Sequence, residues 1–198
     1  MGELSDAGRE SMRAHGVRTV IDLRGDDEIA EVPSPFGEGL TYRRAPFMSA
    51  RIMALHRAAH EGTLPDELRT IAVRGGGLAE AVAAIADAEP GIVLHCAAGR
   101  DRTGIVVAMV LSAIGVPDAE IVADYVASDD ALVEEYDRFK AANPDRAAEV
   151  DAGIAKRAWV MGETLRALHD AFGGAAAYLR LAGVQPAQLD AIRAKLTA

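Results

Sequence analysis

The residues best suited to chemistry in this chain surround its only cysteine. They form one continuous stretch, His95-Cys96-Ala97-Ala98-Gly99-Arg100-Asp101-Arg102-Thr103-Gly104. A short β-branched run over residues 91–94 precedes the cysteine loop, and an apolar run over residues 105–113 follows it. This pattern predicts a buried strand, a tight loop and a helix that begins near residue 103. Inward-pointing backbone N–H groups and the helix dipole would make such a loop a site for anions.

Cys96 and Arg102 determine what that loop could do. The loop N–H groups and the arginine charge would stabilise Cys96 as a thiolate. The planar fork of Arg102 can hold two oxygens of a phosphate. Together they predict the displacement of a phosphoryl group onto sulfur. The alternatives are an inert, buried cysteine that acts as a small apolar side chain and a surface salt bridge for Arg102.

The spacing Cys-x5-Arg-Thr resembles the signature loop of the cysteine-dependent protein tyrosine phosphatases. The longer pattern His-Cys-x-x-Gly-Arg-Asp-Arg-Thr-Gly resembles a bacterial branch of that family, of the kind secreted by mycobacteria. Some members of this branch also accept phosphoserine, phosphothreonine and phosphoinositides. The usual residue at position 100 in the branch is Lys, whereas this chain has Arg100. Residues 20–24, 124–128 and 163–196 resemble the same branch.

The resemblance implies a role for each residue around the loop. Cys96 would be the nucleophile, Arg102 the phosphate ligand and Asp101 the general acid, with Asp22, Asp26 and Asp27 as alternative acids. The expected substrate-binding residues are Ala97, Ala98, Gly99, Arg100 and Thr103, and the expected supporting residues are His95, Asp22 and Arg24. No cofactor is implied.

Four of these residues have more than one interpretation. Arg100 could extend the positive pocket toward a second phosphate, or it could be a simple surface charge. Thr103 is expected to hydrogen-bond the cysteine sulfur, to cap the helix, or both. His95 could order the hydrogen bonds of the loop, or it could be a plain core histidine. Asp22 is expected to pair with Arg24 near the loop.

Composition limits the class of protein. A chain of 198 residues, half of them hydrophobic, is expected to be a single domain over 1–198 with one core. The net charge of −9 argues against nucleic acid as a partner, so a local positive pocket must capture an anionic substrate. No apolar run is long enough for stable membrane insertion, and no signal peptide is visible. We therefore expect a cytoplasmic protein, with secretion by another route left open and the oligomeric state not predicted.

No metal site is expected. The five histidines form no ligand-spaced cluster with cysteines, and the His56/His60 pair lacks the neighbouring Glu of the metalloprotease pattern.

The distribution of turn residues and apolar runs predicts the order of elements. A helix over residues 5–16 precedes strands over 17–23 and 40–45, which a loop over 24–39 connects. Helices are expected over 51–60, 66–73 and 78–88, with a flexible turn at residues 75–77. Strand 91–95 and helix 103–114 follow, and the chain is helical from residue 118 onward. This order predicts an α/β fold: a small, mostly parallel sheet flanked by helices, tyrosine-phosphatase-like, with a helical C-terminal half.

The resemblance adds two expectations and leaves the function open in part. Residues 118–160 could form a helical lid over the loop, or they could be a solvated helical face. The N-terminus appears shortened relative to the branch by two to three dozen residues. The expected function is hydrolysis of protein phosphotyrosine through a cysteinyl-phosphate intermediate, with dual or triple specificity conceivable. The alternatives are a phosphoinositide phosphatase that uses the same loop and a non-catalytic module that binds phosphorylated ligands.

Overall fold

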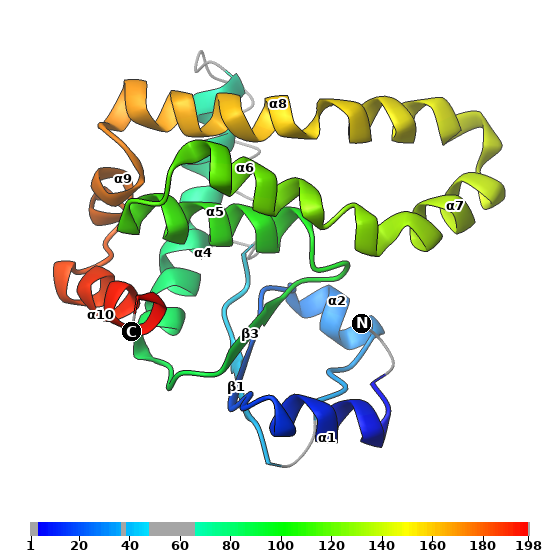
Figure 1. The fold of residues 1–198 in the computed structure, drawn as a ribbon, viewed down its shortest axis with the longest axis horizontal. Helices are drawn as coiled ribbons and strands as arrows, with labels where there is room; N and C mark the ends of the chain where they lie inside the picture. Colours follow the sequence, from blue (N-terminus) through cyan, green and yellow to red (C-terminus); the bar gives the residue numbers. More distant parts are fainter. Residues whose placement is uncertain (1–3, 37–38, 48–65, 198) are drawn as a thin grey trace.

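A small parallel sheet forms the centre of the N-terminal part of the molecule. The computed structural model describes residues 4–36, 39–47 and 66–197. The described strands are β1 (Thr19–Asp22), β2 (Thr41–Arg44) and β3 (Ile92–His95), all parallel and in the order β2-β1-β3 (Figure 1). The predicted α/β fold with a small parallel sheet is confirmed.

The central strand β1 aligns the ends of its two neighbours. All four of its residues are buried. Its last residue, Asp22, is in register with His95 of β3 and Arg44 of β2. Since the carboxyl ends of parallel strands meet at one edge, the cysteine loop after β3 begins directly beside the end of β1. Ligands bind at this edge in open α/β sheets.

Helices make up the rest of the described chain. Helix α4 packs against β1 and α5 against β3, whereas α1 and α2 lie at the opposite end of the molecule from α8 (Figure 1). The α-helices are α1 (Asp6–Ala14), α2 (Asp26–Glu31), α4 (Asp66–Asp87), α5 (Asp101–Ile114), α6 (Asp118–Ala127), α7 (Val133–Ala142), α8 (Ala147–Phe172), α9 (Ala175–Leu181) and α10 (Pro186–Leu196). Short 3-10 turns at Asp130–Leu132 and Pro144–Arg146 flank α7. The helical C-terminal half is therefore confirmed.

Helix α2 corrects the prediction of a continuous loop over residues 24–39. Gly25 adopts the extended conformation of a helix N-cap. The backbone N–H of Gly25 donates a hydrogen bond of 3.0 Å to the Glu28 carboxylate. Acidic residues in the first turn also favour the positive end of the helix dipole. These local interactions stabilise a short helix. The sequence did not predict it, because the glycines and prolines of the segment indicated a loop.

Helix α4 corrects the prediction of a flexible turn at residues 75–77, because it continues through all three glycines to Asp87. At Gly77, an added Cβ atom would lie 2.3 Å from the backbone oxygen of Phe47. The glycine therefore allows the helix to pass directly over the chain that leaves β2. The helix expected at residues 51–60 lies outside the described residues.

Candidate active site

The loop between β3 and α5 has the predicted shape of an anion site. Gly99 has a φ of 71°, a left-handed conformation that suits glycine. Helix α5 begins at Asp101, two residues earlier than expected. The backbone N–H groups of Arg100 and Thr103 are directed at Cys96. The sequence therefore folds locally so that the start of the helix and the loop converge on the sulfur.

The environment of Cys96 favours its thiolate. Burial by itself would raise the pKa of the thiol. Hydrogen bonds from the side chain and backbone of Thr103, the charge of Arg102 and the backbone N–H of Arg100 outweigh that effect, so the pKa lies below its ordinary value of 9.0. The buried Thr103 hydroxyl has no other hydrogen-bond partner among the described residues, which leaves it available to the sulfur. Cys96 therefore has the properties of a nucleophile.

Arg102 is held in place by a residue from α2. Its two terminal nitrogens donate hydrogen bonds of 2.5 and 2.7 Å to the two carboxylate oxygens of Glu28. Arg102 lowers the pKa of Glu28 below its ordinary value, because it donates to the ionised carboxylate. The end-on pairing leaves the guanidinium further N–H groups, including that of Nε, for a phosphate. A partly exposed ion pair with Glu28 therefore orients Arg102 at the loop.

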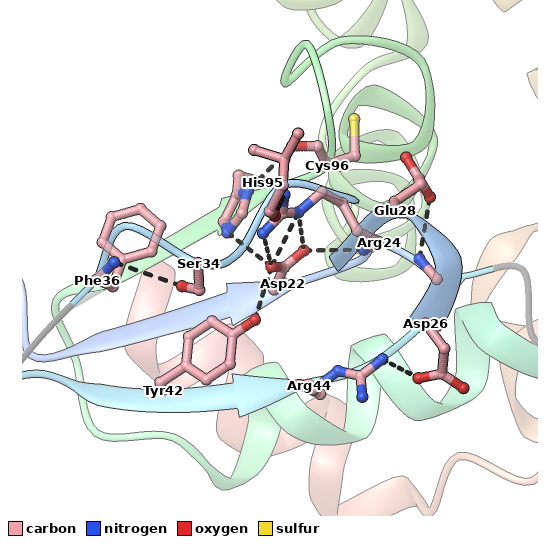
Figure 2. A network of polar contacts seen from close by, with 12 residues as sticks. Asp22, Arg24, Asp26, Glu28, Ser34, Phe36, Tyr42, Arg44, His95 and Cys96 are labelled. Atoms are coloured by element: carbon pink, nitrogen blue, oxygen red, sulfur yellow. Dashed lines mark hydrogen bonds and ion pairs between the residues drawn. The ribbon is translucent and has the colours of Figure 1, made fainter. Parts of the chain in front are cut away.

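A buried polar group lies beneath the loop, and we name Asp22, Arg24, Tyr42 and His95 the inner cluster. Asp22 is completely buried. It accepts hydrogen bonds from the backbone N–H of Arg24 (2.9 Å), from its guanidinium (2.8–3.1 Å) and from the Tyr42 hydroxyl (2.7 Å). Figure 2 shows these contacts, with the Cys96 sulfur directed away from them. The predicted pairing of Asp22 and Arg24 is present.

His95 connects the inner cluster to the loop. Its Nδ1 lies 3.0 Å from the backbone oxygen of Cys96, a distance at which a protonated Nδ1 donates to that carbonyl. Its Nε2 lies 3.5 Å from an oxygen of Asp22. Burial lowers the pKa of His95 below its ordinary value, despite the Cys96 carbonyl and the Asp22 charge, which act in the opposite direction. A neutral histidine therefore fixes the carbonyl of the nucleophile.

The candidate acids lie in different surroundings. Asp101 is exposed in the first turn of α5, at the rim of the loop. Asp22 is enclosed by its hydrogen bonds, so it cannot reach a leaving group. Asp26 pairs with Arg44 at 2.5 Å, and Asp27 is exposed on α2. The geometry thus favours Asp101 as the residue that could deliver a proton at the loop.

A second polar group lies on the other side of the loop, and we name Arg100, Asp129, Tyr136 and Arg157 the outer cluster. Arg100 Nε is 3.3 Å from Asp129 Oδ1, and Arg157 of α8 forms an ion pair with the same oxygen. The Tyr136 hydroxyl contacts Asp129 (3.2 Å) and Arg157 (2.9 Å). Arg100 is therefore not an isolated surface charge, because its side chain is largely buried and ion-paired.

A cavity of about 550 Å³ separates the loop from α7 and α8. Its walls combine loop residues with arginines and apolar side chains of the two helices. The lining residues are Ala98, Arg100, Asp101, Leu132, Glu135, Tyr136, Phe139, Arg146, Val150, Gly153 and Arg157. The loop thus has an adjoining space into which Asp101, the favoured acid, also faces.

Sequence reasoning missed Glu28, Asp129, Tyr136 and Arg157 as residues of the site. The Gly25–Glu28 spacing at the start of α2 was a usable signal for Glu28, because it matches a helix N-terminus whose third residue is acidic. The outer cluster joins α5, the α6–α7 connection and α8, and no local spacing in the sequence indicates that juxtaposition.

The described side chains and helices also bear on metal binding and on membrane spanning. Across residues 4–36, 39–47 and 66–197, no group of three or more His, Cys, Asp or Glu side chains is arranged to hold a metal ion. Over the same residues, no helix is both long and apolar enough to cross a bilayer.

The loop thus brings a cysteine with a lowered pKa, an ion-paired arginine and converging backbone N–H groups together at the edge of the sheet. The chain belongs to the tyrosine phosphatase family, whose sequence model matches residues 1–198. A tyrosine-protein phosphatase of Nostoc commune is 33% identical over 217 aligned positions, which cover 99% of this chain and 71% of the relative. The triple specificity protein phosphatase PtpB of Mycobacterium tuberculosis is 29% identical over 243 positions, covering 99% and 88%. The chain is therefore an enzyme that hydrolyses phosphoric monoesters.

Proposed function

We propose that this enzyme hydrolyses phosphotyrosine in proteins through a cysteinyl-phosphate intermediate. The lowered pKa of Cys96, at the base of a loop whose arginine is already oriented, carries the proposal. In the first step the sulfur attacks phosphorus and the bond to the tyrosine oxygen breaks. Arg102 and the loop N–H groups stabilise the charge on the transferring phosphoryl oxygens. Asp101 gives a proton to the leaving oxygen.

The second step reverses these roles. The Asp101 carboxylate takes a proton from water as the water oxygen attacks phosphorus. The S–P bond breaks, and inorganic phosphate and the Cys96 thiolate are released. The Thr103 hydroxyl, which has no other partner among the described residues, donates to the sulfur as it leaves.

Replacement of Cys96 by serine tests the mechanism. Cys96→Ser should abolish turnover of an aryl phosphate and leave the fold intact, because the serine hydroxyl is not ionised at neutral pH. Steady-state assays with circular dichroism as the folding control measure both effects. Retained hydrolysis by this variant would remove the covalent mechanism. Binding of a phosphopeptide without turnover by the unmodified chain would instead favour a non-catalytic module.

Broader specificity is the second candidate function. One relative is named a triple specificity protein phosphatase, and arginines line the cavity beside the loop. The same residues could act on phosphoserine, phosphothreonine or phosphoinositides. A panel of phosphotyrosine, phosphoserine and phosphoinositide substrates decides this, because kcat/KM for each class can be compared on one preparation.

A covering role for residues 118–160 belongs to the same proposal. Residues of α7 and of the start of α8 line the cavity beside the loop, which supports this role. A helical cover would slow the access of peroxide to Cys96. Loosening residues 129–151 should therefore speed inactivation by peroxide, and an unchanged rate would reduce this segment to a solvated helical face.

A further inference from the structure

The cavity beside the loop gathers three arginines in an acidic protein. The chain has a net charge of −9, yet Arg100, Arg146 and Arg157 all line this cavity. Acids on its walls or next to them pair with these cations: Asp101 and Asp129 with Arg100, Asp129 with Arg157, and Glu149 with Arg146. An anionic ligand would therefore be held here by donors that the ion pairs leave unused, not by an excess of positive charge.

Two of the three arginines have hydrogen-bonding capacity that the folded chain does not use. The side chain of Arg157 is only 9% exposed and that of Arg100 only 13%. The Nε atom of each is buried and makes no hydrogen bond within the described part of the chain. Arg100 Nε has only an ion-pair contact of 3.3 Å with Asp129, without the geometry of a hydrogen bond. Unsatisfied buried donors cost free energy. An anion that supplied acceptors to these two Nε atoms would recover that free energy. An ion pair that only stabilises the fold would be expected to satisfy both donors.

Asp129 is the resident counter-ion of these two arginines. Its Oδ1 lies 3.3 Å from Arg100 Nε and forms the ion pair with Arg157 Nη1. The Tyr136 ring lies 5.0 Å from the Arg157 guanidinium and 5.8 Å from that of Arg100, which holds both cations without neutralising them. Asp129 therefore serves two guanidinium groups, with Asp101 as a further ion-pair partner of Arg100 at 3.4 Å. Arg157 has no carboxylate partner other than Asp129 among the described residues, so an anion with a free acceptor can be accommodated at its Nε.

We propose that Arg100 and Arg157 form an anion subsite that selects phosphotyrosine peptides with an acidic side chain next to the phosphotyrosine. The inference rests on the proposed function. Asp101 faces the same cavity, so the leaving group and the chain attached to it extend toward this side of the loop. The walls also include Leu132, Phe139 and Val150. This apolar lining suits a peptide with its aromatic ring better than a fully hydroxylated inositol.

Matched substrates give the direct test. Two phosphotyrosine peptides should differ only by Glu or Gln at the positions adjacent to the phosphotyrosine, with p-nitrophenyl phosphate as the substrate without flanking residues. We expect kcat/KM to be about tenfold higher for the Glu peptide, the size of one charge-assisted hydrogen bond. A soluble inositol bisphosphate forms a separate arm of the experiment.

Four variants separate the subsite from general effects on folding. Arg157→Met should reduce the Glu/Gln preference to near one, and Arg157→Lys should retain part of it because the charge remains. Asp129→Asn should increase the preference, because it removes the competing carboxylate. The control is Arg166→Gln, which makes the same charge change on α8 among exposed ion pairs. Thermal unfolding of each variant is measured alongside, and Asp129→Asn keeps the test intact if Arg157→Met does not fold.

Opposite changes in preference for Arg157→Met and Asp129→Asn, with Arg166→Gln unchanged, would support the subsite. Equal kcat/KM values for the two peptides in the unmodified enzyme would overturn it. A preference that is the same in all four variants would also overturn it, as would faster hydrolysis of the inositol bisphosphate than of the Glu peptide. Failure to hydrolyse even p-nitrophenyl phosphate would instead remove the proposed function itself.

Discussion

The inner and outer clusters flank the same loop but differ in how the charged groups of each are paired. In the inner cluster the completely buried Asp22 carboxylate accepts hydrogen bonds from Arg24 and Tyr42 on every side. In the outer cluster two largely buried arginines share the Asp129 carboxylate, and the Nε atom of neither makes a hydrogen bond among the described residues. Within the described part of the chain, each cluster nevertheless leaves a buried side-chain nitrogen without a hydrogen bond, His95 Nε2 in the inner cluster and Arg157 Nε in the outer one. The comparison therefore teaches that access decides the use of such an atom: the inner cluster is enclosed and fixes the loop, whereas the outer cluster adjoins a cavity that a ligand can enter.

The largest expected effect is on stability and comes from the inner cluster. Asp22→Asn should lower the free energy of unfolding by about 3–5 kcal/mol, because it leaves the buried Arg24 without its charge partner. Denaturant unfolding measures this, with Asp129→Asn as the matched change in the outer cluster. Asp129 lies beside the cavity, where water can replace it, so its substitution should cost less. Equal losses for the two variants would erase the distinction between the clusters.

Asp22 also predicts how the stability of the fold depends on pH. The Asp22 pKa lies below its ordinary value of 3.8, because the hydrogen bonds and charge around it outweigh burial. Its contribution to stability is therefore complete above pH 3.8 and is lost as the pH falls through the lowered pKa. When the free energy of unfolding is measured at falling pH, the Asp22→Asn variant should therefore lack the loss of stability that Asp22 causes in the unmodified chain.

Asp101, on the outer side of the loop, should give the next largest effect. Asp101→Asn should slow hydrolysis of an ester with a poor leaving group by about a hundredfold, the usual minimum for general acid catalysis. An ester with an activated leaving group should be affected far less, since it needs no proton. Parallel measurements of kcat on both substrates check this. If both slow equally, Asp101 only positions the substrate, and Asp26 and Asp27 become the acids to test.

Glu28 tests how much the orientation of Arg102 contributes. Glu28→Gln removes the charge that holds both terminal nitrogens of the arginine, so kcat/KM for an aryl phosphate should fall about tenfold. Glu31→Gln makes the same charge change at the end of the same short helix and should leave kcat/KM unchanged. A gain in phosphate affinity in Glu28→Gln would show that the carboxylate competes with substrate and does not orient Arg102.

The smallest expected effect concerns a single hydrogen bond to the nucleophile. In the unmodified chain, the rate of Cys96 alkylation by iodoacetamide should rise with pH with a midpoint below 9.0, because the pKa of the thiol is lowered. Thr103→Val removes the hydroxyl that donates to the sulfur and should raise that midpoint. An unchanged midpoint would assign the lowered pKa to Arg102 and the backbone alone.

Local patterns were sufficient to predict the parts of the site that are close in sequence. The β-branched run before Cys96 and the apolar run after Thr103 predicted strand, loop and helix, with an error of two residues at the start of α5. Arg102 could be assigned to the loop because its spacing from Cys96 is itself the signal. Fold class followed from the same reasoning, since short strands early and helices late predict a small sheet with helical cover.

The features of the site and fold that could not be predicted depend on contacts between residues that are far apart in the sequence. Glu28 is 74 residues from its partner Arg102, and no periodicity connects them. At Gly77 the helix lies against the backbone of Phe47, which leaves no room for a Cβ atom, so tertiary packing requires the residue that helix propensity disfavours. Arg157 belongs to a 26-residue helix with a solvated outer face, and its burial depends on the packing of α7 beside that helix. The sequence of α8 alone does not indicate this burial.

The position of Asp22 at the end of β1 also has a consequence for how the chain folds. Tyr42 is paired with Val20, two residues before Asp22, and His95 is paired with Asp22 itself, so all three side chains emerge on one face of the sheet. A slip of one residue in either neighbouring strand would turn Tyr42 or His95 to the opposite face. The buried carboxylate would then lose its partners at a high cost in free energy. The network beneath the nucleophile therefore also specifies the register of the strands, because a misaligned sheet would be less stable.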